Sequence, residues 1–246
     1  MRETPDIETS SDSYAQRFSG AAGEYLLSMQ QQKVGDALSA RFGNTVLDVG
    51  GGHGQLAPDL VESGHDVTVL GSSNDCYKRV RQGKGGEDVK LVTGDLLNLP
   101  FPDNSFDLVI SVRLISHIEH WPRLVREFCR VARTAIVIDY PSTSGINALT
   151  PLLFKVKRGI EQNTRTYKSF SRKELSEEFR RNDFCVSGLY PQFLLPMVIH
   201  RVMKGTLWLR AVEKFCATFG LTRIFGSPVI LRADRCESRG ARRWEE

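Results

Sequence analysis

The sequence predicts an α/β protein built on a doubly wound, seven-stranded, mostly parallel sheet. Short apolar runs of strand length alternate with segments of helical spacing from residue 46 to residue 140. The run 106–112 is almost continuously apolar, which is typical of a parallel strand covered by helices on both faces. In such sheets the turns at the carboxyl ends of the strands meet in one crevice, where ligands bind.

The individual elements follow from spacing and from turn residues. Helical spacing is found at 55–61 and from Pro122 to Ala132, and a capping box of Ser171 and Glu174 begins a later helix. The segment 14–38 is also helical in pattern, and Gly20 and Gly23 are predicted to divide it in two. Strands are predicted at residues 46–49, 65–71, 88–92, 106–112, 135–140, 184–190 and 228–233.

The domain organisation has one main unit with additions. Residues 1–12 are charged and rich in Ser and Thr, so they are predicted to be disordered. The main domain spans 13–233 and begins with helices at 13–42. Insertions at 141–169 and 191–226 interrupt the alternation of strands and helices. The first insertion is basic, and the second is apolar and predicted to be helical. A polar tail covers 234–246.

Composition limits the class of protein. The chain has 246 residues, of which 41% are hydrophobic and 25% charged, as in ordinary globular domains. No apolar run is long enough for a transmembrane helix, and the start does not resemble a signal peptide. The five cysteines are widely separated, which argues against a disulfide framework and for a cytoplasmic location. His117 and His120 lack a third ligand nearby, so no metal site is predicted.

A glycine-rich turn follows the first strand. Asp48 is followed by glycines at 50, 51, 52 and 54, and a helix begins just after them. Glycines let the backbone lie directly against a ligand, and a helix start favours a negative group there. The third glycine of a dinucleotide fingerprint is missing, because position 55 is Gln. The Asp48 carboxylate would repel a pyrophosphate and attract an ammonium group. A turn without a ligand, or a nicotinamide or flavin site, stays an alternative.

With these residues the chain resembles the class I S-adenosylmethionine-dependent methyltransferases, in particular the ubiquinone and menaquinone branch that acts on small molecules. The resemblance implies a Rossmann-like fold whose last strand is antiparallel. It implies S-adenosylmethionine as the cofactor, held at Asp48 and at Gly50, Gly51 and Gly52.

Three further segments carry the resemblance. Asp95, in a Gly-Asp pair after the third strand, is implied to accept from the adenine amino group, and the backbone of Leu96 to face the ring. Ser111 ends the fourth strand, where the family contacts the methionine part. The second strand departs from the pattern, because Gly71 and Ser72 stand where the family has an acid that binds the ribose. Ser72 can offer polar atoms there, but without a carboxylate's charge.

The segment after the fourth strand supplies the candidate catalytic group. It resembles the family segment that lies near the transferred methyl group, and it contains His117. A histidine titrates near neutrality, so we predict His117 as a general base for a hydroxyl or acidic carbon. Amine or sulfur acceptors need no base, and His117 would then only pack. Arg113, Tyr140 and His200 are weaker candidates for contact with substrate.

Two features near the ends of the domain remain open at this stage. The Tyr14 and Phe18 pair resembles a lid over the cofactor, but both rings could equally pack a helix onto the sheet. The apolar 191–226 insertion, together with the basic residues of 155–168, suggests a greasy acceptor that bears a negative group. It could equally be the core of a helical cap.

The predicted function is methyl transfer to a small apolar or lipid-like metabolite by in-line displacement. Two alternatives remain: a methyltransferase for RNA or protein, and a non-catalytic binding subunit of the same fold. A net charge of +4 is too small to indicate nucleic acid, so none is expected as a partner. Peripheral contact with a membrane or lipid remains open.

Overall fold

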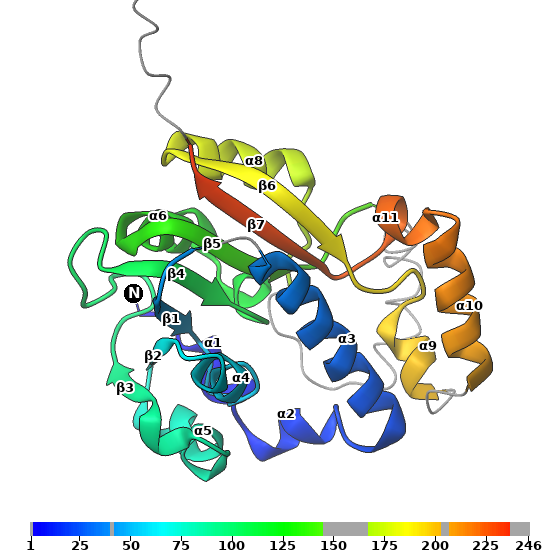
Figure 1. Cartoon of the computed structure of the whole chain (residues 1–246), viewed down its shortest axis with the longest axis horizontal. Helices are drawn as coiled ribbons and strands as arrows, with labels where there is room; N and C mark the ends of the chain where they lie inside the picture. Colours follow the sequence, from blue (N-terminus) through cyan, green and yellow to red (C-terminus); the bar gives the residue numbers. More distant parts are fainter. Residues whose placement is uncertain (1, 40–41, 145–166, 203–206, 237–246) are drawn as a thin grey trace, which may run out of the picture.

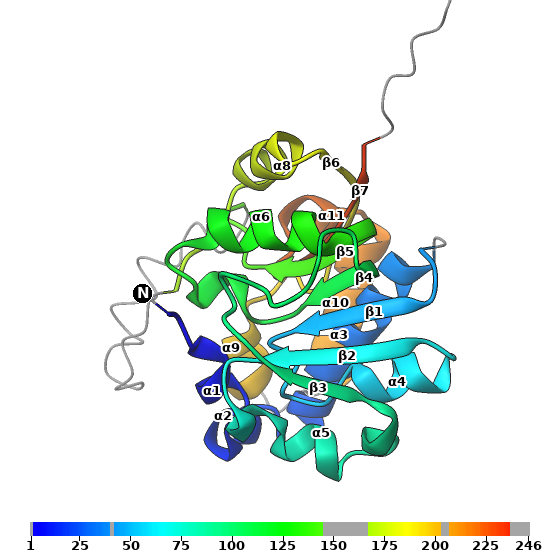
Figure 2. The same ribbon diagram turned by 90° about the vertical axis from the view of Figure 1, so that its left-hand side faces the viewer.

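The computed structural model describes residues 2–39, 42–144, 167–202 and 207–236. In these residues it shows a seven-stranded sheet in the order β3-β2-β1-β4-β5-β7-β6 (Figure 1, Figure 2). Strand β7 is antiparallel to both of its neighbours, and the others are parallel, so the predicted fold class is confirmed. The strands are β1 Thr45–Val49, β2 Asp66–Gly71, β3 Lys90–Thr93, β4 Phe106–Ser111, β5 Ala132–Tyr140, β6 Phe184–Pro191 and β7 Val229–Arg235.

Helices cover both faces of the sheet. Helices α6 and α8 lie on one face, and α3, α4 and α5 lie on the other (Figure 1). The described helices are α1 Pro5–Thr9, α2 Asp12–Gln16, α3 Gly20–Leu38, α4 Ala57–Glu62, α5 Lys78–Gln82, α6 Trp121–Val131, α8 Arg172–Arg181, α9 Met197–Val202, α10 Leu207–Thr218 and α11 Leu221–Phe225, with 3-10 turns η1 Asn74–Tyr77, η2 Gly86–Asp88 and η3 Ile115–His117.

The two hydrophobic layers explain why the sheet is covered in this way. Successive residues of a strand point to opposite faces, so Val46 belongs to one layer and Leu47 to the other. Phe128 of α6 and Phe179 of α8 fill the layer that contains Leu47, and both are fully buried. A parallel sheet buried on both sides reads as a continuous apolar run, as the sequence predicted for β4.

The helical N-terminal part is divided differently from the prediction. Gly20 has a φ of +70° and lies at the start of α3, which then continues through Gly23 to Leu38. A Cβ on Gly23 would lie 2.0 Å from the backbone carbon of Phe18, so glycine is needed there for close approach. The sequence cannot distinguish such a packing glycine from a helix breaker.

The 191–226 insertion is helical, as predicted, and forms α9, α10 and α11 beside β6 (Figure 1). A buried carboxylate ties it together: Glu213 of α10 accepts hydrogen bonds from the amides of Leu194 and Leu195, each at 2.9 Å. Its Oε1 also lies 3.0 Å from Nε2 of His200, which is fully buried. The insertion at 141–169 lies mostly outside the described residues, as does the polar tail beyond Cys236.

Two expectations differ from the structure. Residues 1–12 were expected to be disordered, but from residue 2 onward they are described and contain helix α1, because Asp6 is fully buried against Ser72. The wide spacing of the cysteines argued against disulfides, but Cys185 and Cys236 are bonded. The pairing of β6 with β7 brings these two residues together across 51 positions of sequence.

The disulfide should stabilise the pairing of the last two strands. Closing a loop of 51 residues corresponds to roughly 4 kcal/mol in the chain-entropy account. We expect Cys185→Ser to lower the melting temperature in non-reducing buffer. Dithiothreitol should lower the melting temperature of the parent protein to the same value. Equal melting temperatures for parent and variant without reductant would contradict this.

Within the described residues, no helix is long and apolar enough to cross a membrane. The predicted cytoplasmic location stays a prediction.

Candidate cofactor site

Hydrogen bonds join the carboxyl ends of four neighbouring strands. The amide of Gly50 donates to the carbonyl of Leu70 at 2.8 Å, and the amide of Gly94 donates to the carbonyl of Gly71 at 3.0 Å. The hydroxyl of Ser111 donates to the carbonyl of Val49 at 2.8 Å. The segments that the sequence singled out therefore meet at one edge of the sheet.

The glycine turn has the conformation that its sequence indicates. Gly50 and Gly54 have φ angles of +76° and +64°, in the left-handed region that favours glycine. A Cβ on Gly52 would lie 2.5 Å from the carbonyl oxygen of Cys76. Only a residue without a side chain fits at this point, because Ser10 and Cys76 lie directly against the glycine.

Asp48 is buried beneath this turn. Its Oδ1 has no hydrogen-bond partner among the described residues. Burial raises the pKa of Asp48 to about 7, although the nearby Arg113 guanidinium acts in the opposite direction. A buried, unpartnered carboxylate oxygen fits a ligand that donates from an ammonium group, as S-adenosylmethionine does.

The loop that carries Asp95 is held from outside by α6. Asp95 accepts a hydrogen bond from the amide of Leu97 at 2.9 Å, and the side chain of Leu96 is fully buried. Arg130 of α6 donates to the carbonyls of Leu99 and Phe101 at 2.9 and 2.8 Å. The loop conformation therefore depends on a guanidinium that lies outside the crevice.

We expect Arg130→Ala to destabilise the fold by about 2 kcal/mol, because two carbonyls and Glu127 lose a charged donor. Thermal unfolding measures this. The matched control is Arg126→Ala, which removes an exposed arginine from the same helix. Equal melting temperatures for the two variants would contradict the role given to Arg130.

The structure gives a reason why position 71 holds a glycine and not the acidic residue that would bind the ribose. The ring of Tyr77 lies over Gly71, where a Cβ would be 3.1 Å from the ring carbon Cε1. The Tyr77 hydroxyl accepts a hydrogen bond from the Gly71 amide at 3.0 Å. A carboxylate side chain at position 71 would need the space that this ring occupies.

Residues 2–10, called the 2–10 segment below, lie across these strand ends. The amide and the hydroxyl of Ser72 donate to the Asp6 carboxylate at 2.6 and 2.5 Å. Arg2 donates to the carbonyls of Ser72 and Gly94 at 2.6 and 2.7 Å. A Cβ on Gly52 would lie 2.2 Å from the hydroxyl oxygen of Ser10. The segment thus touches three of the loops predicted to hold the cofactor.

The predicted base lies at the rim of this edge. His117 ends the 3-10 turn η3, is half-buried, and has its ring 5.8 Å from that of Tyr167. Its catalytic role remains a prediction.

Arg113 is half-buried close to the glycine turn. It has a φ of +61°, its amide donates to Asp139 at 2.6 Å, and its guanidinium is hydrogen-bonded to Gln55. The guanidinium carbon lies 4.7 Å from the centre of the Phe18 ring. The Tyr14 ring lies 5.7 Å from that of His53, within the glycine turn. The proposed lid residues therefore lie beside this turn.

Sequence reasoning gave two weaker candidates that are buried elsewhere. Tyr140 belongs to the hydrophobic core, where burial raises its pKa to about 12. His200 is enclosed by the insertion and paired with Glu213. Sequence reasoning did not identify Asp139 and Asp6 as residues of this site. The sequence pattern could have identified Asp139, because this residue follows an apolar run of strand length as Asp48 does. For Asp6 no motif exists, since its contact depends on tertiary structure.

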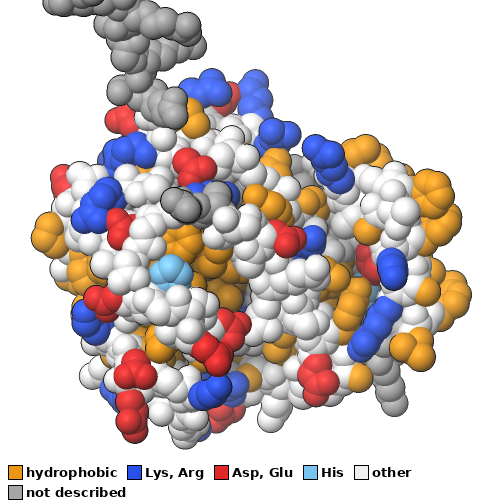
Figure 3. Space-filling model, in the orientation of Figure 1, with side chains coloured by type: hydrophobic (Ala, Val, Ile, Leu, Met, Phe, Trp, Pro, Cys, Tyr) orange, Lys and Arg blue, Asp and Glu red, His pale blue; other side chains and the backbone are white. Residues whose placement is uncertain are grey.

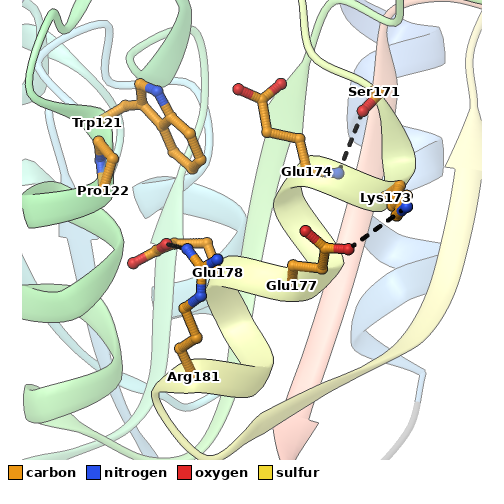
Figure 4. Close-up of a pocket in the computed structure, with 8 residues that line it drawn as sticks. All are labelled: Trp121, Pro122, Ser171, Lys173, Glu174, Glu177, Glu178 and Arg181. Carbon is orange, nitrogen blue, oxygen red and sulfur yellow. Dashed lines mark hydrogen bonds and ion pairs between the residues drawn. The ribbon is translucent and has the colours of Figure 1, made fainter.

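A cavity of about 390 Å³ lies away from this edge, between α6 and α8 (Figure 4). Four of its charged side chains pair with one another, Lys173 with Glu177 and Arg181 with Glu178, and Glu174 pairs with Lys168 outside the cavity. None of its lining residues belongs to the segments predicted to hold the cofactor.

Comparison with known proteins identifies the central part of this arrangement. Residues 47–135, which include β1 to β4 and their loops, match the methyltransferase domain family. Over these residues the chain is similar to methyltransferase domains. The match confirms the resemblance to S-adenosylmethionine-dependent methyltransferases, and it supports the predicted enzyme class and cofactor.

Curated relatives match over about half of the chain. The chain is 32% identical to demethylmenaquinone methyltransferase of Paenarthrobacter aurescens, over 52% of this chain and 53% of that protein. It is 30% identical to an uncharacterized methyltransferase of Geobacillus sp., over 46% of this chain and 53% of that protein. The chain spans about half the length of these two relatives.

Solved structures resemble the whole fold. A putative methyltransferase of Haloferax volcanii, in complex with the Trm112 methyltransferase activator, has a TM-score of 0.64 at 18% identity, over 94% of this chain and 98% of its own. Magnesium protoporphyrin IX methyltransferase from Synechocystis PCC 6803, with bound SAH, has a TM-score of 0.62 at 15% identity, over 93% and 97%. At such identities the likeness shows the fold alone.

Proposed function

We propose that this protein transfers a methyl group from S-adenosylmethionine to a small, apolar or lipid-like acceptor. The observation that carries the proposal is the buried Asp48 carboxylate, which has an oxygen without a hydrogen-bond partner among the described residues, beneath the glycine turn. Asp48 would hold the ammonium group, the backbone of Gly50, Gly51 and Gly52 the amino-acid part, and Asp95 the adenine amino group. Gly71, Ser72, Leu96 and Ser111 complete the proposed cofactor contacts.

The bound cofactor supplies an electrophilic methyl group, so the protein has little bond chemistry to perform. Its residues mainly align the acceptor and exclude water. Tyr14 and Phe18 lie beside the glycine turn, where they can restrict solvent. His117 would take the proton from a hydroxyl or acidic carbon of the acceptor.

The proposed acceptor class follows from chemistry and from relatives. The described part of the 191–226 insertion is rich in aromatic and aliphatic side chains, which suits a greasy acceptor. Similar proteins include a demethylmenaquinone methyltransferase and a sterol 24-C-methyltransferase of Aspergillus fumigatus, whose named acceptors are apolar. A quinol and a sterol are therefore the first acceptors to assay.

The proposed base is tested by replacing His117 with Gln. We expect turnover of a hydroxyl or carbon acceptor to fall by about a hundredfold or more, with S-adenosylmethionine affinity unchanged. The matched control is His65→Gln, because His65 precedes β2 at the opposite edge of the sheet. Unchanged turnover in the His117 variant would remove its role as base while leaving the cofactor site standing.

A further inference from the structure

An unusual hydrophobic surface lies on α10 and α11. Seven of the nine large hydrophobic side chains that are exposed in the described part of the chain fall between residues 207 and 225. We call them the aromatic patch: Leu207, Trp208, Phe215, Phe219, Leu221, Ile224 and Phe225. In Figure 3 they appear as hydrophobic side chains along the edge formed by these helices.

The patch is not an incompletely buried core face. Helix α10 already packs through Leu209, Glu213 and Cys216, which are all buried. Trp208, Phe215 and Phe219 form a second stripe on the outer side, at helical spacing, and are 66%, 61% and 66% exposed. The helix is therefore apolar on its outer face as well, and an exposed apolar surface of this kind marks an interaction site.

The charges around the patch indicate its partner. Lys214 and Arg223 are exposed, whereas Glu213, the one carboxylate between residues 207 and 225, is buried and bonded within the insertion. The patch therefore presents aromatic side chains with positive charge and no exposed negative charge. A symmetric contact between two copies would bring Lys214 and Arg223 close to their own equivalents, which is unfavourable.

We propose that α10 and α11 bind the surface of a membrane that contains anionic lipids. Phe and Trp side chains enter the boundary between headgroups and acyl chains, and Lys and Arg attract the negative surface. This proposal rests on the patch and not on the proposed methyl transfer. If both are correct, the protein would meet a lipid-like acceptor where such molecules reside.

The test is co-sedimentation of the full-length protein with vesicles of phosphatidylcholine, with and without phosphatidylglycerol. We expect binding that requires phosphatidylglycerol and weakens with salt. The triple variant Trp208→Ser, Phe215→Ser, Phe219→Ser should lose binding. The double variant Lys214→Glu, Arg223→Glu should bind at least about tenfold more weakly.

The matched control is Lys173→Glu, which reverses an exposed charge on α8, far along the chain from the patch. It should bind vesicles as the parent does. Absence of vesicle binding by the parent protein would overturn the proposal. So would a concentration-dependent dimer, abolished by the triple variant, in a protein that does not bind vesicles. S-adenosylmethionine binding, measured on the same samples, reports on the proposed function separately.

A second inference concerns the 2–10 segment, and it rests on the proposed cofactor site. Asp6 is 0% exposed and takes both the amide and the hydroxyl hydrogen of Ser72. Ser10 lies against Gly52, and the Arg2 guanidinium donates a hydrogen bond to the Gly94 carbonyl. Ser72 and Gly52 are among the proposed cofactor contacts, and Gly94 directly precedes Asp95.

We infer that the 2–10 segment closes the cofactor groove and must move when the cofactor binds. Glu3 anchors it on the far side, accepting from the amides of Glu119 and His120 at 2.7 and 3.0 Å. Closure by the 2–10 segment then competes with cofactor binding. Substitutions that weaken the contacts of this segment should therefore raise the affinity for the cofactor.

Calorimetry with S-adenosylhomocysteine tests this on the Asp6→Ala variant and on a protein lacking residues 2–10. Both should bind about tenfold more tightly than the parent protein. The control Asp12→Ala removes an exposed aspartate that pairs with Lys78 and Arg79 on the outside, and it should bind as the parent does.

Weaker binding in both variants would overturn the inference, because Asp6 would then contribute to the cofactor site. Equal binding by parent and variants would also overturn it, while leaving the proposed function intact. Absence of binding in every protein would instead count against the proposed function.

Discussion

Replacing Gly52 with Val is expected to weaken binding of S-adenosylmethionine by about a hundredfold. A Cβ at this position would lie 2.2 Å from the Ser10 hydroxyl oxygen and 2.5 Å from the Cys76 carbonyl oxygen, so the valine side chain would displace the turn that is proposed to hold the cofactor. Overpacking of this kind corresponds to about 3 kcal/mol, or roughly a hundredfold in affinity. Calorimetry on the folded variant measures the loss.

The control for this variant is Gly35→Ala. Gly35 lies in the last turn of α3, and an added Cβ would have no neighbour within 4 Å. Alanine should therefore leave cofactor binding unchanged and stabilise the helix by up to about 1 kcal/mol. Retention of parental affinity by the Gly52→Val variant would show that the turn does not contact the cofactor.

Cofactor affinity should also depend on pH through Asp48. Burial raises the pKa of this carboxyl to about 7 in the cofactor-free protein, so it is largely protonated below that pH. An ammonium group requires the ionised form, so a proton must leave on binding. The dissociation constant should therefore rise about tenfold for each pH unit below 7 and level off above it.

The variant Asp48→Asn separates this effect from other groups. Asp139 has its pKa raised by burial to about 6, so it titrates in a neighbouring range. With Asn at position 48 the affinity should be low at every pH, and the slope between pH 6 and 7 should disappear. A parental dissociation constant that stays flat from pH 5.5 to 8, or a slope that survives in the variant, would contradict the role of Asp48.

The sheet and the meeting of the strand ends at one edge could be predicted because both depend on local patterns. Apolar runs such as β4, and the acid and glycines after β1, carry their meaning within a few residues. Parallel pairing then fixes where Gly50, Gly71 and Gly94 meet. The helical nature of the 191–226 insertion could be predicted in the same way.

The remaining features depend on contacts between distant parts of the chain. Asp6 contacts Ser72 across 66 positions, and Cys185 bonds to Cys236 across 51. The reason for Gly71 is the Tyr77 ring, which only the folded chain places above it. Burial of Glu213 could not be predicted either, because a charged residue on a helix is normally assigned to solvent.

The most direct test of this account is titration of the parent protein, and of the protein lacking residues 2–10, with S-adenosylmethionine. The account predicts one binding site, tighter in the shortened protein and weaker in the Gly52→Val variant. Absence of binding in both folded proteins at neutral pH would contradict it, and would leave a methyltransferase fold that does not bind the methyl donor.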